Sequence, residues 1–208
     1  VVVPAGQSTA TFTYTDTTGA GTVIGATLDG VSLQATVNVS AGASGLVINE
    51  VDYDQVSSPD GASFIEIYNG TSGDVALANL AVVLVNGANG LEYNRFALGD
   101  AGATLPAGGY LLIHNSTVAA GGALSIIASG DFLQNGAPDG VALIDTSTQT
   151  LVDALSYEGS LTAATITGFA APVSLVAGTA TPAGDNGDPA RSLARIANGA
   201  DSGDDNLD

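Results

Sequence analysis

The 208-residue chain contains no cysteine and no lysine, and its only basic side chains besides one histidine are three arginines. Without cysteine, neither a disulfide framework nor a thiolate metal site can form. Without lysine, the phosphate-binding loop that ends in Gly-Lys is excluded. Three arginines cannot build the basic patch that nucleic-acid binding requires, so we expect no direct contact with nucleic acid.

Negative charge dominates the ionisable groups. Aspartate and glutamate number 21, and the net charge is −18. Such a chain is repelled by anionic membrane surfaces and attracts cations. No stretch approaches the roughly 20 apolar residues of a membrane span, so we expect no membrane insertion. The opening residues 1–4 lack the basic region and the apolar run of a signal peptide. The acidic, lysine-free composition favours an extracellular or cell-surface location.

The order of apolar residues predicts an all-β protein. Apolar residues make up 45% of the chain, enough for a packed core. Short β-type runs alternate with glycine, asparagine, aspartate and proline, and no window keeps a helical period over ten residues. Residues 9–15 alternate strictly, as in a half-buried antiparallel strand. Residues 21–28 and 31–39 flank Asp29-Gly30, which is typical of a hairpin.

Residues 1–41 resemble the C-terminal part of a bacterial Ig-like domain. The resemblance rests on the segments 3–7, 10–13, 21–24 and 33–39. Ig-like domains need about seven strands, so this part would form an incomplete sheet with an open apolar face. We expect that face to be covered by the second domain or by another copy of the chain, which gives possible self-association through residues 1–40. Its apolar residues are Phe12, Tyr14, Val23 and Val37.

After a small, flexible linker at residues 42–45, the remaining chain, residues 46–208, has a series of strand-like blocks. A Leu-Pro-Ala-Gly-Gly turn feeds one of them, and two others are spaced as a hairpin. The acidic C-terminus follows a Ser-Leu-Ala-Arg block. In chain order the blocks are 46–51, 64–69, 80–85, 105–113, the hairpin pair 139–145 and 151–157, then 191–195 and 198–208.

In this order the blocks resemble the lamin tail domain in its bacterial form, over about residues 45–208. The resemblance implies an Ig-like antiparallel β-sandwich without catalytic residues. In bacteria the family occurs beside nucleases, phosphatases and adhesive repeats. The sequence departs from the family at Leu80, where a tryptophan is common.

Three side chains invite a catalytic interpretation. His114 is the only histidine, and a Ser-His-Asp triad would need it, but no serine is marked as its partner; a solvated strand end is the alternative. Glu50 and Glu66 lie on consecutive predicted strands and could face each other, like the paired carboxylates of glycosidases. Their alternative is structural, with bonds to backbone groups or to Arg191 or Arg195. We expect no catalytic residues and no enzymatic activity.

The acidic C-terminus is a candidate calcium site. Calcium takes six to eight oxygen ligands, and a short acidic loop with glycine suits it. Weaker candidates are residues 185–188 and the pair Asp52 and Asp54 with Asp60; none fits an EF-hand loop. Solvated turns are the alternative in each case. The metal ligands predicted at the C-terminus are Asp201, Asp204, Asp205, Asn206 and Asp208.

Together these features predict a non-catalytic structural or interaction module of a secreted or surface multidomain bacterial protein. It would space or dock neighbouring domains of the same polypeptide or bind another protein. The alternative is a targeting module of an extracellular hydrolase, a nuclease or a phosphatase, whose catalytic domain lies outside this chain.

Overall fold

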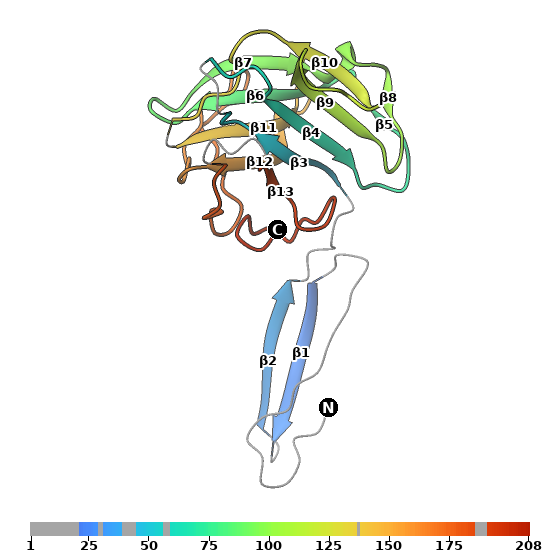
Figure 1. Cartoon of the computed structure of the whole chain (residues 1–208). Coiled ribbons are helices and arrows are strands. Elements are labelled where there is room, and N and C mark those ends of the chain that lie inside the picture. The colour runs from blue at the N-terminus through green and yellow to red at the C-terminus, as the bar shows by residue number, and fades with distance from the viewer. Residues whose placement is uncertain (1–20, 29–30, 39–44, 56–58, 137, 186–190) are drawn as a thin grey trace. The chain divides into compact units, whose positions relative to one another are not determined.

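The computed structural model describes residues 21–28, 31–38, 45–55, 59–136, 138–185 and 191–208. The chain forms two compact units, Val1–Gly42 and Ala43–Asp208 (Figure 1). In the first unit, strands β1 (Gly21–Leu28) and β2 (Val31–Asn38) pair antiparallel, as the sequence predicts. The strand predicted over residues 9–15 lies outside the described residues. The Ig-like character of this unit stays a prediction.

The second unit consists of two larger sheets and one small strand pair. The five-stranded sheet has the order β10-β9-β4-β3-β13, and the four-stranded sheet has the order β12-β11-β6-β7. Strands β5 and β8 form a separate pair. The first sheet contains β3 (Leu46–Asp52), β4 (Phe64–Asn69), β9 (Tyr110–Asn115), β10 (Leu124–Ala128) and β13 (Leu193–Ala194). The others are β6 (Leu80–Asn86), β7 (Leu91–Ala97), β11 (Asp139–Asp145), β12 (Thr150–Tyr157), β5 (Val75–Ala76) and β8 (Thr104–Leu105).

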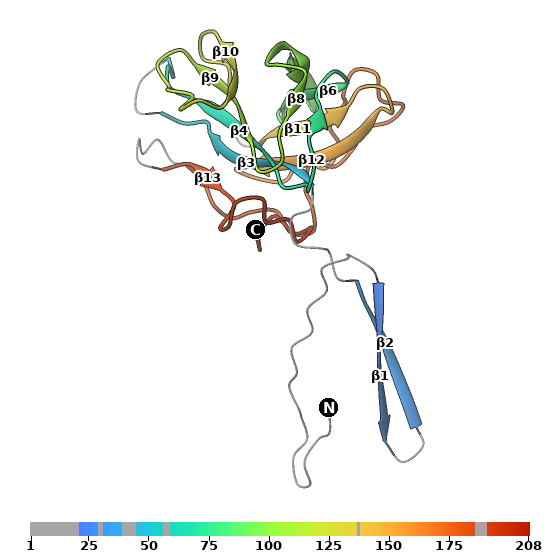
Figure 2. The same ribbon diagram turned by 90° about the vertical axis from the view of Figure 1, so that its right-hand side faces the viewer.

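The two sheets pack face to face around one apolar core (Figure 2). On β4, Ile65 and Ile67 point inward and are fully buried, while Glu66 between them points outward, because side chains alternate along a strand. From the opposite sheet, Val82 and Leu84 enter the same core. The predicted all-β sandwich is therefore confirmed. The predicted blocks 46–51, 64–69 and 80–85 form β3, β4 and β6, block 105–113 leads into β9, and block 191–195 contains the short β13. The predicted hairpin is confirmed as β11–β12, with small shifts at the strand ends.

The four-stranded sheet is buried on its outer face as well. Val83 and Val85 of β6 point away from the central core and pack under a segment that follows β12. This covering segment, residues 161–175, contributes Leu161 and Leu175, which are almost completely buried. Burial on both faces explains why residues 80–85 form a continuous apolar run rather than an alternating one.

Gly140 on β11 allows the covering segment to approach the sheet. A Cβ atom at this position would lie 2.7 Å from Leu175 Cδ1 and 3.2 Å from Leu161 Cδ2. Only glycine therefore leaves room for both leucines.

Two irregularities shape the sheets further: β3 has a bulge between Ile48 and Glu50, and β10 pairs with β9 in parallel.

Among the described residues the only helical element is one 3-10 turn, Leu98–Asp100. No described helix is long and apolar enough to cross a membrane.

Candidate functional site

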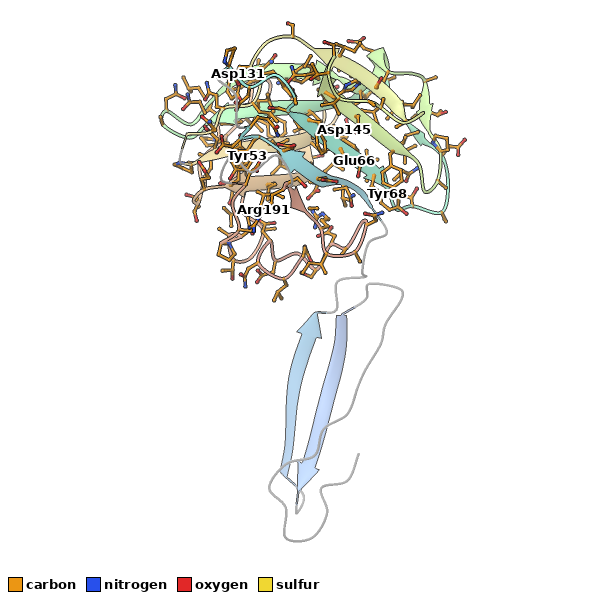
Figure 3. The ribbon with its side chains drawn as sticks, in the orientation of Figure 1. Tyr53, Glu66, Tyr68, Asp131, Asp145 and Arg191 are labelled. Atoms are coloured by element: carbon orange, nitrogen blue, oxygen red, sulfur yellow. The ribbon has the colours of Figure 1, made fainter. Side chains whose placement is uncertain are left out.

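Glu50 and Glu66 meet on the outer face of the five-stranded sheet, where β3 and β4 place them directly opposite each other. Figure 3 labels Glu66 and, two residues along the same strand, Tyr68. The Asn49 Nδ2 amide donates a hydrogen bond of 2.7 Å to Glu66 Oε1. The Ser192 hydroxyl donates to Glu50 Oε1. Burial, with the nearby Glu50 charge, raises the pKa of Glu66 above its usual value, although the Asn49 bond opposes this.

Arg195, one of the two arginines that the sequence offered as partners for these glutamates, binds other carboxylates. The Arg195 guanidinium donates to Asp153 Oδ2 at 3.0 Å and to Asp208 Oδ2 at 2.9 Å. It also donates to the backbone carbonyl oxygens of Ile48 and Ala200. The side chains of this cluster are at most 10% exposed. Arg195 thereby joins β3, β12 and the C-terminal segment, which continues beyond β13 to residue 208.

Asp153 is the buried member of this cluster. Its carboxylate accepts from the backbone nitrogens of Ile48 at 2.7 Å and Ala154 at 2.9 Å, besides Arg195. Burial raises the pKa of Asp153, and Arg195 together with the two amides works against that rise. The Ile48 contact links the two sheets of the sandwich, because Asp153 lies on β12 and Ile48 on β3.

Beside Glu66 the outer face of the five-stranded sheet carries aromatic and apolar side chains around a cleft. The rings of Tyr68 and Tyr110 are 4.9 Å apart between centroids and tilted by 40°. The cleft has a volume of about 630 Å³. Its floor is Glu66, Tyr110 and Leu112, and its walls are residues 104–106 and 119–124. Ile127, on the edge strand β10, is 68% exposed.

His114 is a core-type residue and not the solvated strand end that the sequence suggested. It is 4% exposed, because it lies inside β9 between β4 and β10. Its Nδ1 atom is 2.8 Å from the Asn115 carbonyl oxygen, and its Nε2 atom has no hydrogen-bond partner. No serine hydroxyl is bonded to this ring among the described residues, so the geometry of a triad is missing there.

The acidic C-terminus folds back onto the protein. Asp208 binds Arg195 and accepts from the Ser202 backbone nitrogen at 2.8 Å. Asp205 Oδ2 accepts from the Ala177 backbone nitrogen at 3.0 Å. Burial raises the pKa of Asp205 to about 6, with Asp153 and Asp208 adding to the rise. The segment is therefore attached to the fold through its carboxylates.

The remaining predicted aspartates of the C-terminus also have protein partners, and Asn206 contributes its backbone nitrogen. Asp204 accepts from the Thr179 hydroxyl and the Asn206 backbone nitrogen, and Asp201 accepts from the Gly203 backbone nitrogen. Among the residues that the structure describes, no three acidic or histidine side chains converge closely enough to hold a metal ion. Calcium binding by residues 201–208 stays a prediction.

Asp185, the one described residue of the candidate at 185–188, meets the candidate at Asp52 and Asp54, and residues 186–188 lie outside the described residues. Asp185 Oδ2 accepts from the backbone nitrogens of Tyr53 at 3.1 Å and Asp54 at 3.0 Å. The Asp52 carboxyl contacts Asp185. Burial raises the pKa of Asp52 to about 7, the contact and the charge of Asp185 add to the rise, and a bond from Gln55 opposes it. Asp60, the third member of the sequence motif, is also buried.

The sequence analysis marked Glu50, Glu66 and the acidic loops, but it did not identify Asp153 or the partners of Arg195. The one signal that could have pointed to Asp153 is weak, namely an aspartate inside an otherwise apolar strand. Its partners lie 42 and 105 positions away, and nothing in the local sequence identifies such distant contacts.

Comparison with known proteins matches residues 39–159, more than half of the chain, to the family model described as Lamin Tail Domain. No curated protein matches the chain. The match ends shortly after β12, so the resemblance seen in residues 160–208 stays a prediction.

Proposed function

The chain belongs to the lamin tail domain family, and we propose that it is a non-catalytic module that docks or spaces neighbouring domains. The family domain is Ig-like, in agreement with the sandwich described above. We place the module in a secreted or surface-exposed multidomain protein of a bacterium. Its partners are neighbouring domains of the same polypeptide or another protein, and the first forty residues are a candidate for self-association.

The observation that carries the docking proposal is the outer face of the five-stranded sheet. Tyr68, Tyr110 and Leu112 lie there beside the Glu66 carboxylate and a cleft of about 630 Å³. Tyrosine is enriched at the centres of protein interfaces, because a large apolar ring carries a polar end. The exposed Ile127 extends the apolar surface along the sheet edge.

The contacts of the two glutamates support the non-catalytic part of the proposal. A general acid must be free to protonate a leaving group, and its partner must hold water or attack the sugar. Glu50 and Glu66 instead accept bonds from Ser192 and Asn49, which belong to adjoining strands or their ends. The carboxylates thus link β4 to β3 and β3 to the residue that precedes β13.

The charge of the chain supports a cationic partner surface. With 21 acidic residues and three arginines, the protein attracts surfaces that carry lysine and arginine and repels phosphate backbones. A partner with alternating apolar and basic side chains would place the apolar ones on Tyr110 and Leu112 and the basic ones near Glu66. This complementarity also disfavours nucleic acid and anionic membranes as ligands.

Peptide titration followed by NMR tests the docking surface. The probe is Leu-Lys-Leu-Lys-Leu, and the control peptide is Leu-Glu-Leu-Glu-Leu, both in 150 mM salt to screen distant charges. We expect the basic peptide to shift the signals of Tyr110, Leu112 and their neighbours, and Glu66→Gln to weaken that binding. Shifts spread evenly over the acidic surface, or no shifts at all, would contradict the proposal.

Activity assays test the non-catalytic part. Purified protein is incubated with ester, phosphodiester, glycoside and peptide substrates, together with folded Glu50→Gln and Glu66→Gln variants. We expect product formation no faster than in buffer for all three proteins. Turnover by the wild-type protein that disappears in either variant would refute the proposal.

A further inference from the structure

The cleft on the outer face of the five-stranded sheet has mainly apolar walls and one acid at its floor. Leu105, Pro106 and Leu124 line it together with three alanines, and Glu66 is the only carboxylate among its lining residues. Its volume of about 630 Å³ lies within the range of ligand-binding clefts, roughly 300–1,000 Å³. Such a cleft suits a group with an apolar body and a positively charged end.

Glu66 can accept a further hydrogen bond. Its Oε1 atom accepts from the Asn49 side chain at 2.7 Å, and no described residue donates to its Oε2 atom. Glu50 lies directly opposite on β3, and like charges in that position destabilise a sheet. Burial also disfavours the charged form of the half-buried Glu66 carboxyl. A cation in the cleft would offset both effects.

The chain itself does not place a cation in the cleft. It has no lysine, and none of its three arginines is among the residues that line the cleft. Arg95 pairs with Glu92 on β7, and Arg195 pairs with Asp153. The positive charge that would neutralise Glu66 must therefore come from a partner.

We propose that the cleft binds one lysine side chain of the partner, an inference that rests on the docking function proposed above. Lysine carries a compact charge on a four-carbon stem, so the stem packs on the apolar walls and the ammonium reaches Glu66. Arginine fits less well, because its planar fork bonds both oxygens of a carboxylate, and Asn49 already occupies Oε1. The Tyr110 ring at the floor, whose hydroxyl accepts from the Asn198 side chain at 2.6 Å, adds cation–π attraction.

Carbodiimide cross-linking tests this anchor. The reagent joins a carboxylate to a lysine amine, with loss of water, where the two groups are in contact. Because the chain has no lysine, any lysine in a cross-link must come from the probe. The probe is the acetylated and amidated peptide Leu-Thr-Lys-Thr-Leu, in about 150 mM salt to screen distant charges. We expect mass spectrometry to find the cross-link mainly at Glu66, although the chain has 21 acidic residues.

Affinities separate a lysine anchor from a general attraction between opposite charges. Peptides with acetyl-lysine, norleucine or arginine in place of the lysine are titrated into the protein and followed by NMR. We expect acetyl-lysine and norleucine to weaken binding roughly tenfold or more, because a charge-assisted hydrogen bond is lost. Arginine should weaken binding less, since it keeps the charge.

Two pairs of variants locate the anchor. Glu66→Gln keeps an oxygen for Asn49 and should abolish the cross-link, whereas Glu50→Gln, its matched control, removes an equal charge outside the cleft and should keep it. Ala119→Phe, at an exposed position of the wall, should obstruct the cleft and weaken binding with Glu66 intact. Ala170→Phe, exposed on the covering segment of the other sheet, should leave binding unchanged.

The lysine anchor and the docking surface can fail separately. Cross-links spread over the acidic residues in proportion to their exposure, or no cross-link at Glu66, would overturn the anchor. An arginine peptide that binds more tightly than the lysine peptide would also overturn it. If all four peptides bind the cleft with equal affinity, the docking surface stands and the anchor fails. If none of them shifts the signals of Tyr110 and Leu112, the docking proposal fails as well.

Discussion

The two outer faces of the sandwich differ in whether the chain itself covers them. The four-stranded sheet is covered by residues 161–175 of its own chain, and the contact is a second apolar core. The five-stranded sheet carries half-buried tyrosines, two opposed glutamates and a cleft on its outer face. One face is closed by folding, and the other keeps the aromatic and charged groups that a partner can bind.

The covering segment, residues 161–175, and the C-terminal segment are also attached to the sandwich in different ways. The segment over the four-stranded sheet is held mainly by buried leucines, which respond little to salt or pH. The C-terminal segment beside β3 is held by Arg195 and its carboxylates. The covering segment is therefore held by apolar burial, whereas the attachment of the C-terminal segment depends on salt and pH.

The largest loss of stability should come from removing Arg195, which attaches the C-terminal segment through ion pairs. Arg195→Met removes the cationic partner that Asp153 has among the described residues and leaves that carboxylate buried without a counter-charge, which costs about 3–5 kcal/mol. Urea unfolding monitored by circular dichroism measures the loss. The double variant Arg195→Met with Asp153→Leu should recover part of it. A loss below about 1 kcal/mol would show that the attachment does not depend on this ion pair.

The second largest loss of stability should come from a change in the covering segment, residues 161–175. Leu175→Ala creates a cavity under the covering segment and should cost about 3 kcal/mol, because the side chain is completely buried. Leu112→Ala is the matched change on the opposite outer face, where the leucine lines the cleft, and should cost about 1–2 kcal/mol. The same urea experiment compares them. Equal losses would contradict the distinction between a closed face and an open one.

The smallest changes in stability should come from replacing a glutamate on each outer face, and they should differ in sign. Glu92, on β7, binds Arg95 at 2.8 Å and the Thr167 backbone nitrogen at 2.8 Å. Burial alone raises its pKa, but these bonds outweigh burial and lower it. Its carboxylate therefore stabilises the fold above the unfolded-state pKa, and this contribution is lost as the pH falls through the folded-state pKa.

Glu66 has a raised pKa, so its contribution is largest at low pH and is lost as the pH rises through the folded value. Consequently Glu92→Gln should destabilise the protein at pH 7, by less than about 1 kcal/mol, and Glu66→Gln should be neutral or slightly stabilising. Both differences should shrink toward pH 3. Thermal unfolding from pH 3 to pH 8 checks the signs, and equal signs would disprove the electrostatic contrast.

The strands of the sandwich could be predicted because their side-chain patterns are local. The alternation of residues 64–69 predicted a half-buried strand, and the continuous apolar run at 80–85 is explained by burial on both faces. The sequence did not predict residues 161–175 as a cover, because they lack a regular period and form no strand. It also missed the bulge at Asn49, which depends on pairing with β4.

The candidate sites were predictable only in part. The sequence suggested that Glu50 and Glu66 could face each other, and it marked the acidic loops at Asp52 and Asp185 as separate candidates. That the loops meet depends on a hydrogen bond from the Tyr53 backbone nitrogen to the Asp185 side chain, across 132 positions. The burial of His114 was not predicted, because a histidine at the end of an apolar run gives no sign that strands pair on both sides of it. Leu80, where the family commonly has tryptophan, is partly buried against the central core.

The pairing of β13 with β3 has a consequence for synthesis. Ser192, next to β13, binds Glu50 on β3, 142 positions earlier in the chain. At about 5–20 residues per second, the ribosome needs roughly 7–28 s to make the intervening polypeptide. Throughout that time one edge of β3 has no strand to pair with, although β4 is already available. The sandwich therefore reaches its native state only after its last strand has left the ribosome, and a chaperone that acts on it must protect this edge until then.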